Sequence, residues 1–170
     1  MKNKIAFLGL FAALAIILGY VESLLPVFIG IPGIKLGLTN LVIVFILYLY
    51  SWKEALLISV VRILAIGFLF GNLYSILFSL AGGVLSLFVM YFMRKIPGFS
   101  VLGVSVAGGV THNIGQLFVA AFVVTNFKLM YYLPVLLVSG VVTGLLIGMV
   151  SGEIWKHVGA YIRKNNREKL

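Results

Sequence analysis

Apolar sequence of membrane-spanning length runs through almost the whole chain. A helix needs about 20 predominantly apolar residues to cross a bilayer, and apolar residues make up 62% of the 170 residues while charged residues make up only 10%. Soluble domains of this size do not carry so much apolar surface, so the composition indicates an integral membrane protein. The length leaves room for about six spanning helices, and we predict a single all-α transmembrane domain over residues 1–170.

Short polar or glycine- and proline-containing breaks divide this apolar sequence into six segments. The first segment follows Met-Lys-Asn-Lys and superficially resembles a signal peptide, but we expect it to remain as the first spanning helix because further spans follow it. The later breaks fall at 51–54, 71–72, 94–98 and 126–128. The predicted spans are residues 5–22, 36–51, 54–71, 73–93, 101–125 and 130–158.

Residues 22–40 form the break that departs most from a helix. Pro26 and Pro32 lack the backbone donor that a helix uses, and several glycines relax the backbone further. A first helix should therefore end near Glu22 and a second should begin around Lys35. The sequence between them stays apolar, and irregular backbone is tolerated at membrane depth only where it is buried in protein or lines a cavity. We interpret this stretch as a lid or cavity wall.

The basic residues are distributed unevenly between the two sides of the predicted domain. Six spans place both termini on one side, and that side receives every lysine and arginine except Lys35, Lys128 and Arg62. Basic loops mark the cytoplasmic side, so we expect a bacterial cell-membrane protein with cytoplasmic termini and a basic tail over 159–170. The bases are not gathered on a soluble domain, which argues against nucleic acid as a partner. Anionic lipid head groups are the expected partner of the tail.

Polar side chains lie at membrane depth in several of these segments. Ionisable groups are costly there and point by default to function; Arg62 stands in the middle of the third span, and His112 and Gln116 share one face of the fifth. Two interpretations remain open, a binding cavity or structural contacts that include an Arg62–Glu22 ion pair. We favour a cationic cavity that takes an anionic ligand. The predicted substrate-binding residues are Glu22, Lys35, Asn40, Arg62, His112, Asn113 and Gln116.

The residue types that carry most enzyme chemistry are missing from the sequence. The chain has no cysteine, and its four acids are all glutamates, which removes thiol chemistry and aspartate-held magnesium. His112 has no acid within one helical turn to orient it as a base. No Gly-x-x-x-x-Gly-Lys segment is present to hold ATP phosphates. We therefore predict no catalytic residues, no metal site and no cofactor, and we expect any ATPase activity in a partner.

Small residues recur at helical spacing in two of the segments. The first carries Gly9, Ala12 and Ala13, and the sixth carries glycine at every fourth position, at Gly140, Gly144, Gly148 and Gly152. Such faces let another helix approach closely. Spacing alone leaves open whether that helix belongs to this chain or to a partner protein. We take Gly9, Ala12, Ala13, Gly140, Gly144 and Gly148 as candidate partner-coupling residues.

Two motifs carry a family resemblance. Pro-Gly-Ile-Lys-Leu-Gly at 32–37, continuing to Asn40, and His-Asn-Ile-Gly-Gln at 112–116 resemble the Gx transporter family, which is also described as heptaprenyl diphosphate synthase component I. Arg62 and Ser-Leu-Ala-Gly-Gly at 79–83 add to the likeness, which covers about residues 5–155. More distantly, the chain is similar to the S components of energy-coupling-factor transporters.

The resemblance implies a six-helix S component that captures a small anionic or isoprenoid- or quinone-related molecule from the outer face. It also implies a membrane coupling (T) subunit and two ABC-type ATPases as partners, with the small-residue face of the first helix docking the coupling subunit. The alternative is a non-catalytic accessory of isoprenoid or menaquinone synthesis, or of quinone-linked extracellular electron transfer. Prenyl diphosphate synthases bind magnesium diphosphate through aspartate-rich motifs, and this chain has no aspartate.

Overall fold

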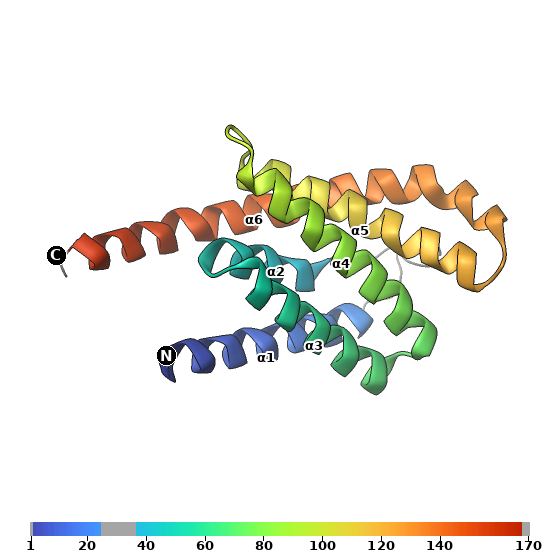
Figure 1. Cartoon of the computed structure of the whole chain (residues 1–170), viewed down its shortest axis with the longest axis horizontal. Helices are drawn as coiled ribbons and strands as arrows, with labels where there is room; N and C mark the ends of the chain where they lie inside the picture. Colours follow the sequence, from blue (N-terminus) through green and yellow to red (C-terminus); the bar gives the residue numbers. More distant parts are fainter. Residues whose placement is uncertain (1, 25–36, 168–170) are drawn as a thin grey trace.

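The computed structural model describes residues 2–24 and 37–167, which are helical apart from short connections (Figure 1). Lys35 and most of the predicted lid lie outside these residues. The six-helix, all-α architecture expected from the sequence is confirmed. The elements are α1 (Lys2–Leu24), α2 (Leu38–Leu49), α3 (Trp52–Phe70), α4 (Leu73–Lys95), α5 (Val101–Val123), the 3-10 turn η1 (Phe127–Tyr132) and α6 (Leu133–Arg167).

The helices differ in whether their length and composition suit them to cross a membrane. Four segments, in α1, α4, α5 and the unit made by η1 and α6, are long and apolar enough to span. Helix α3 has 19 residues but includes three charged ones, Lys53, Glu54 and Arg62. Helix α2 has 12 residues and therefore rises about 18 Å, little more than half of a hydrocarbon core of about 30 Å. Within the second span predicted at 36–51, the structure has this short helix at Leu38–Leu49.

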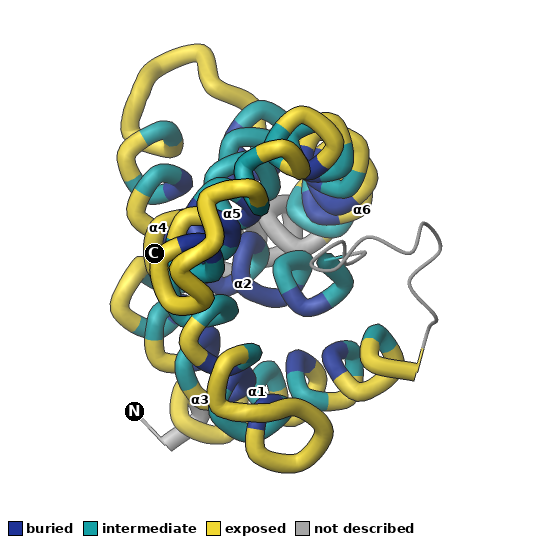
Figure 2. The backbone as a smooth tube through the Cα atoms, turned by 90° about the vertical axis from the view of Figure 1, so that its right-hand side faces the viewer, coloured by how far each residue is buried: buried dark blue, intermediate teal, exposed yellow. Residues whose placement is uncertain are grey.

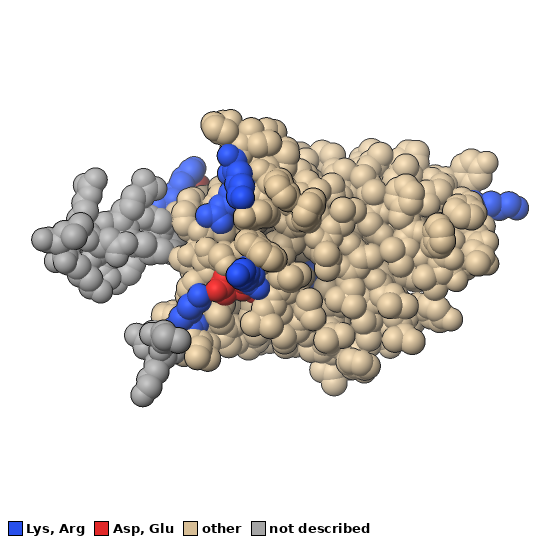
Figure 3. Space-filling view, viewed as in Figure 1, with Lys and Arg blue, Asp and Glu red and all other residues tan. Residues whose placement is uncertain are grey.

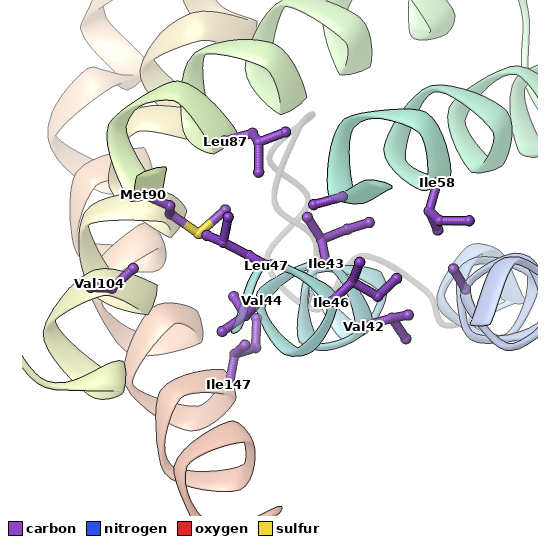
Figure 4. Close-up of a cluster of buried hydrophobic side chains, with 12 residues drawn as sticks. Val42, Ile43, Val44, Ile46, Leu47, Ile58, Leu87, Met90, Val104 and Ile147 are labelled. Carbon is purple, nitrogen blue, oxygen red and sulfur yellow. The ribbon is translucent and has the colours of Figure 1, made fainter. Parts of the chain in front are cut away.

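Helix α2 lies at the centre of the bundle and is buried on nearly every side (Figures 2 and 4). Ile46 and Leu47 are fully enclosed, and the surrounding cluster takes residues from all five other helices, such as Ile58 of α3 and Met90 of α4. A helix that is apolar all round is expected in such a position. Close packing, rather than exclusion of water, stabilises a helix held among apolar neighbours in lipid.

Both ends of α2 are capped by charged side chains from other helices. At its start the carboxylate of Glu22, near the end of α1, accepts a hydrogen bond from the backbone N–H of Gly37. At its end the guanidinium of Arg94, from α4, donates to the backbone carbonyl of Leu47. Each charge opposes the partial charge of the helix end that it meets. Gly37 has a φ of 73°, a left-handed conformation that favours glycine.

The glycine series of α6 packs against α5 of the same chain. A Cβ added at Gly140 would lie 2.9 Å from the Cα of Val110, and one added at Gly144 would lie 2.6 Å from the Cα of Val106. A Cβ added at Gly148 would lie 2.8 Å from the Cα of Leu102. Because α5 fills this groove, the structure assigns these three glycines to internal packing, and we withdraw them as partner-coupling candidates.

Basic side chains gather at one end of the molecule (Figure 3). That end also carries both termini of the described chain (Figure 1). Lys128 lies on η1, at the opposite end, where α5 turns into α6 (Figure 1). Between the two ends the surface in view is uncharged (Figure 3), and many large apolar side chains such as Phe68, Phe88 and Phe122 are exposed. A polar solvent does not favour such a surface, whereas a bilayer does.

Candidate functional site

Arg62 is a buried cation whose hydrogen bonds to the described residues go to neutral side chains. It stands near the middle of α3 and is 8% exposed. Its Nη1 donates to Thr39 Oγ1 at 2.7 Å, and its Nη2 donates to Asn40 Oδ1 at 3.2 Å. Its Nε has no hydrogen-bond partner among the described residues. The guanidinium is therefore held against the first turn of α2 with one donor unused.

Glu22 approaches the same turn from α1. Its carboxylate acts on Arg62 electrostatically, but its hydrogen bond goes to the N–H of Gly37. Within the described part of the chain, Glu22 forms no ion pair with Arg62 inside 4.0 Å. The contact ion pair considered from the sequence is thus replaced by an indirect arrangement. The acid and the base meet different groups of one helix N-terminus.

The first turn of α2 is where these groups converge. A helix N-terminus carries partial positive charge and exposes backbone N–H groups, so it favours anions. Here the N-cap position is Gly37, which offers no side chain to cap the helix. Sequence reasoning selected Glu22, Asn40 and Arg62 but missed Thr39, which is 3% exposed and accepts the shorter Arg62 bond. The position of Thr39 next to Asn40 in the Lys-Leu-Gly-Leu-Thr-Asn motif is the sequence feature that could have identified it as a site residue.

Asn40 also borders a small internal cavity beside α2. The cavity volume is about 10 Å³, room for about one water molecule. Its walls come from α2, α4, α5 and α6, and they include the hydroxyls of Ser86 and Ser105. The Ser86 hydroxyl donates to the carbonyl of Gly108 at 2.8 Å. In the described ranges this enclosed space is too small for an organic ligand.

The polar residues of α5 have different surroundings. The side-chain amide of Asn113 donates to the carbonyl of Leu136 at 2.8 Å and so ties α5 to α6. His112 and Gln116 are half-buried and pack against Gly82 of α4, where an added Cβ would lie 2.7 Å from Gln116 Cγ. The hydrogen bonds of Arg62 go to α2. The structure therefore groups Glu22, Asn40 and Arg62, and it places Gln116 where α5 meets α4 and Asn113 where α5 meets α6.

The glycine pair of α4 explains how these two polar faces approach each other. A Cβ added at Gly82 would meet α5, whereas one added at Gly83 would lie 3.3 Å from Ser59 Oγ on α3. Ser59 precedes Arg62 by three residues and shares its face of α3. Helix α4 therefore contacts the Ser59–Arg62 face on one side and the His112–Gln116 face on the other.

The small-residue face of α1 divides into an outward and an inward part. A Cβ added at Gly9 would meet nothing within 4 Å, and Ala13 is exposed. Ala12 instead packs against the central apolar cluster. Gly9 and Ala13 are therefore available to another protein, while Ala12 serves the interior.

Comparison with known proteins gives one family. The family described as heptaprenyl diphosphate synthase component I matches residues 11–154 of the chain. No curated protein matches the chain, and no solved structure does.

Proposed function

The chain belongs to the heptaprenyl diphosphate synthase component I family, and from that premise we propose that it is a membrane subunit that binds a small anionic molecule. The observation that carries the proposal is Arg62, which is 8% exposed and whose hydrogen bonds within the described ranges go to neutral oxygens. An arginine at the centre of a membrane helix costs about 2.5–3.5 kcal/mol on insertion scales. A bound anion would offset that cost and explain why the charge is kept.

We place this binding subunit in an importer of the energy-coupling-factor type. The chain would act as its S component, taking the ligand from the outer face, and would work with a membrane coupling subunit and two ABC-type ATPases. The absence of a Gly-x-x-x-x-Gly-Lys segment from the sequence supports an energy source in other subunits. The apolar exterior and the exposed positions Gly9 and Ala13 of α1 support a lipid-embedded contact with such a partner.

Purification of the tagged chain from its native membranes tests this proposal. Stable recovery of a membrane coupling subunit with a pair of ATPases supports the importer. Mass spectrometry of small molecules released from the same preparation should identify an anion. Recovery of neither ATPases nor an anionic ligand would contradict the proposal.

The family description favours a second candidate, a non-catalytic accessory of isoprenoid diphosphate synthesis. In that role the chain would hold an isoprenoid substrate in the membrane for a soluble synthase. The accessory would leave the chemistry to its partner, because the chain has no aspartate to hold magnesium diphosphate. Recovery of a soluble prenyl synthase in place of the ATPases would favour this candidate.

The clustering of bases at the end that carries both termini predicts the orientation in a bacterial cell membrane. A reporter that is active only in the cytoplasm should work when fused after Lys95, at the end of α4, or after Leu170. The same reporter should be inactive after Lys128, on η1 at the opposite end. Activity after Lys128 would overturn the six-helix topology with cytoplasmic termini.

The outward face of α1 predicts where the coupling subunit docks. Replacing both Gly9 and Ala13 by leucine should greatly reduce the coupling subunit recovered with the tagged chain, because the side chains would fill a face that is open in this chain. Ligand binding and Tm should change little. Gly152→Leu is the matched control, since an added Cβ there also meets nothing within 4 Å. Undiminished recovery of the partner from the Gly9/Ala13 variant would exclude this face.

A further inference from the structure

We infer that Glu22 is an exchangeable occupant of an anion site, and that the ligand is a carboxylate whose carboxyl group replaces that of Glu22 at the first turn of α2. This inference rests on the proposed binding function, and it names the chemical class of the ligand and the residues that bind it. It is drawn from two independent features of that turn, the helix N-terminus with its bound carboxylate and the buried guanidinium of Arg62.

The N-terminus of α2 already holds a carboxylate. Helix α2 is 12 residues long, and its N-cap Gly37 supplies no capping side chain. The N–H of Gly37 donates instead to Glu22, which is 15 residues earlier in the chain and belongs to another helix. Partial positive charge and free N–H groups make this position suited to one anionic group. In the structure this position is occupied by the carboxylate of Glu22.

Arg62 provides the second, independent feature. Its side chain is more than nine-tenths buried, its two Nη atoms are anchored on Thr39 and Asn40, and its Nε is unpartnered within the described ranges. Thr39 and Asn40 belong to the first turn of α2, so the guanidinium is held beside the helix N-terminus. An anion at this turn would meet both the N–H of Gly37 and the positive charge of Arg62.

The contacts of Glu22 are weaker than those that such an anion could make. Glu22 lies in the last turn of α1, is half-buried, and makes one hydrogen bond here, without a contact ion pair to Arg62. A free carboxylate is not tethered to α1 and can satisfy Gly37 and Arg62 together. Charge-assisted bonds of this kind are about twice as strong as neutral ones. A ligand larger than acetate adds the contacts of the rest of its molecule to these bonds, so it can displace the tethered Glu22, whereas acetate alone does not.

The charge of the described residues at this turn favours a carboxylate over a diphosphate. Among the described residues, Arg62 is the cation that contacts this turn, and Glu22 adds a negative charge nearby. A diphosphate carries more negative charge than one arginine balances, and proteins usually hold it with several cations or with magnesium. One carboxylate matches one guanidinium in charge and in its planar shape.

Purified Glu22→Ala protein tests the exchange by chemical rescue. Removing the side chain empties the site, so sodium acetate should raise the Tm of this variant by about 4 °C or more relative to sodium chloride at equal ionic strength. The wild-type Tm should hardly change, because Glu22 occupies the site. Glu22→Gln is the size-matched control and should not respond, because the amide fills the same space. The double variant Glu22→Ala with Arg62→Gln should lose most of the rise.

Each other outcome overturns the inference. An equal rise in wild type or in Glu22→Gln would place acetate elsewhere, and no rise in Glu22→Ala would exclude exchange. A larger rise with pyrophosphate than with acetate would exclude the carboxylate class. If Glu22→Ala does not fold, Glu22→Ser purified in acetate replaces it, and failure of both to fold in acetate also counts against exchange. The assay needs no partner and no transport, so its failure leaves the importer proposal standing, and failure to recover ATPases leaves the acetate result standing.

Discussion

Replacing Arg62 by glutamine should weaken binding of the ligand about thirtyfold while the protein stays folded. A hydrogen bond to a charged group contributes about 1.5–3 kcal/mol, and roughly 2 kcal/mol corresponds to about thirtyfold in Kd. The fold should survive because Arg62 donates to neutral oxygens on Thr39 and Asn40, while Glu22 keeps its own bond to Gly37. Titration calorimetry on the purified protein, with the ligand identified by mass spectrometry, measures the change.

Two further variants separate a binding role of Arg62 from a structural one. Arg62→Lys keeps the charge but loses the planar fork, so it should retain part of the affinity. If Arg62 instead served as the structural partner of Glu22, Arg62→Gln would lower the Tm, and adding Glu22→Gln would restore it. If the double variant regained the wild-type Tm and cells took up the ligand as before, Arg62 would not belong to the binding site. The main support for an anionic ligand would then be lost.

Replacing Gly144 by alanine should destabilise the protein by about 2 kcal/mol. The added Cβ would lie 2.6 Å from the Cα of Val106 and 3.0 Å from the carbonyl oxygen of Ser105. These are backbone atoms, so α5 and α6 have to move apart rather than rotate a side chain. Overpacking costs about 1–3 kcal/mol, and a change of this size should lower the Tm by about 4–8 °C. Thermal unfolding in detergent or nanodiscs measures it.

Gly152→Ala is the matched control in the same helix. Its added Cβ meets nothing within 4 Å, and alanine is favoured over glycine in a helix by up to about 1 kcal/mol. This variant should therefore be as stable as the wild type or slightly more stable. Equal destabilisation by both substitutions would show that the α5–α6 approach at Gly144 is not what limits stability.

The sequence predicts the number of helices because each break carries its own local signal. Ser51 and Asn72, at two of the breaks, both become N-caps of the helices that follow, a role that their short polar side chains favour. The grouping of Glu22, Asn40 and Arg62 was also accessible, since polar residues are rare at membrane depth and usually find one another. These inferences needed no knowledge of tertiary structure.

Other features depend on packing that composition does not encode. The pattern of an apolar segment is the same whether lipid or protein surrounds it, so the sequence does not show that α2 is short and enclosed by the other helices. Glycine spacing shows that a close neighbour exists but not which one, and only the fold assigns α5 to Gly144. Asparagine is a residue type that often contacts ligands, yet the side-chain amide of Asn113 donates to the backbone carbonyl of Leu136.

The short α2 and the charged α3 also constrain how the protein enters its membrane during synthesis. Helix α2 is too short to span alone, and α3 carries three charges, one of them at its middle. Neither would partition readily into lipid as a single segment emerging from the translocon. They are joined through only Tyr50 and Ser51, and the bonds from Arg62 to Thr39 and Asn40 link the middle of α3 to the first turn of α2. They should therefore insert together, as one helical hairpin in which Arg62 already has two of its hydrogen bonds.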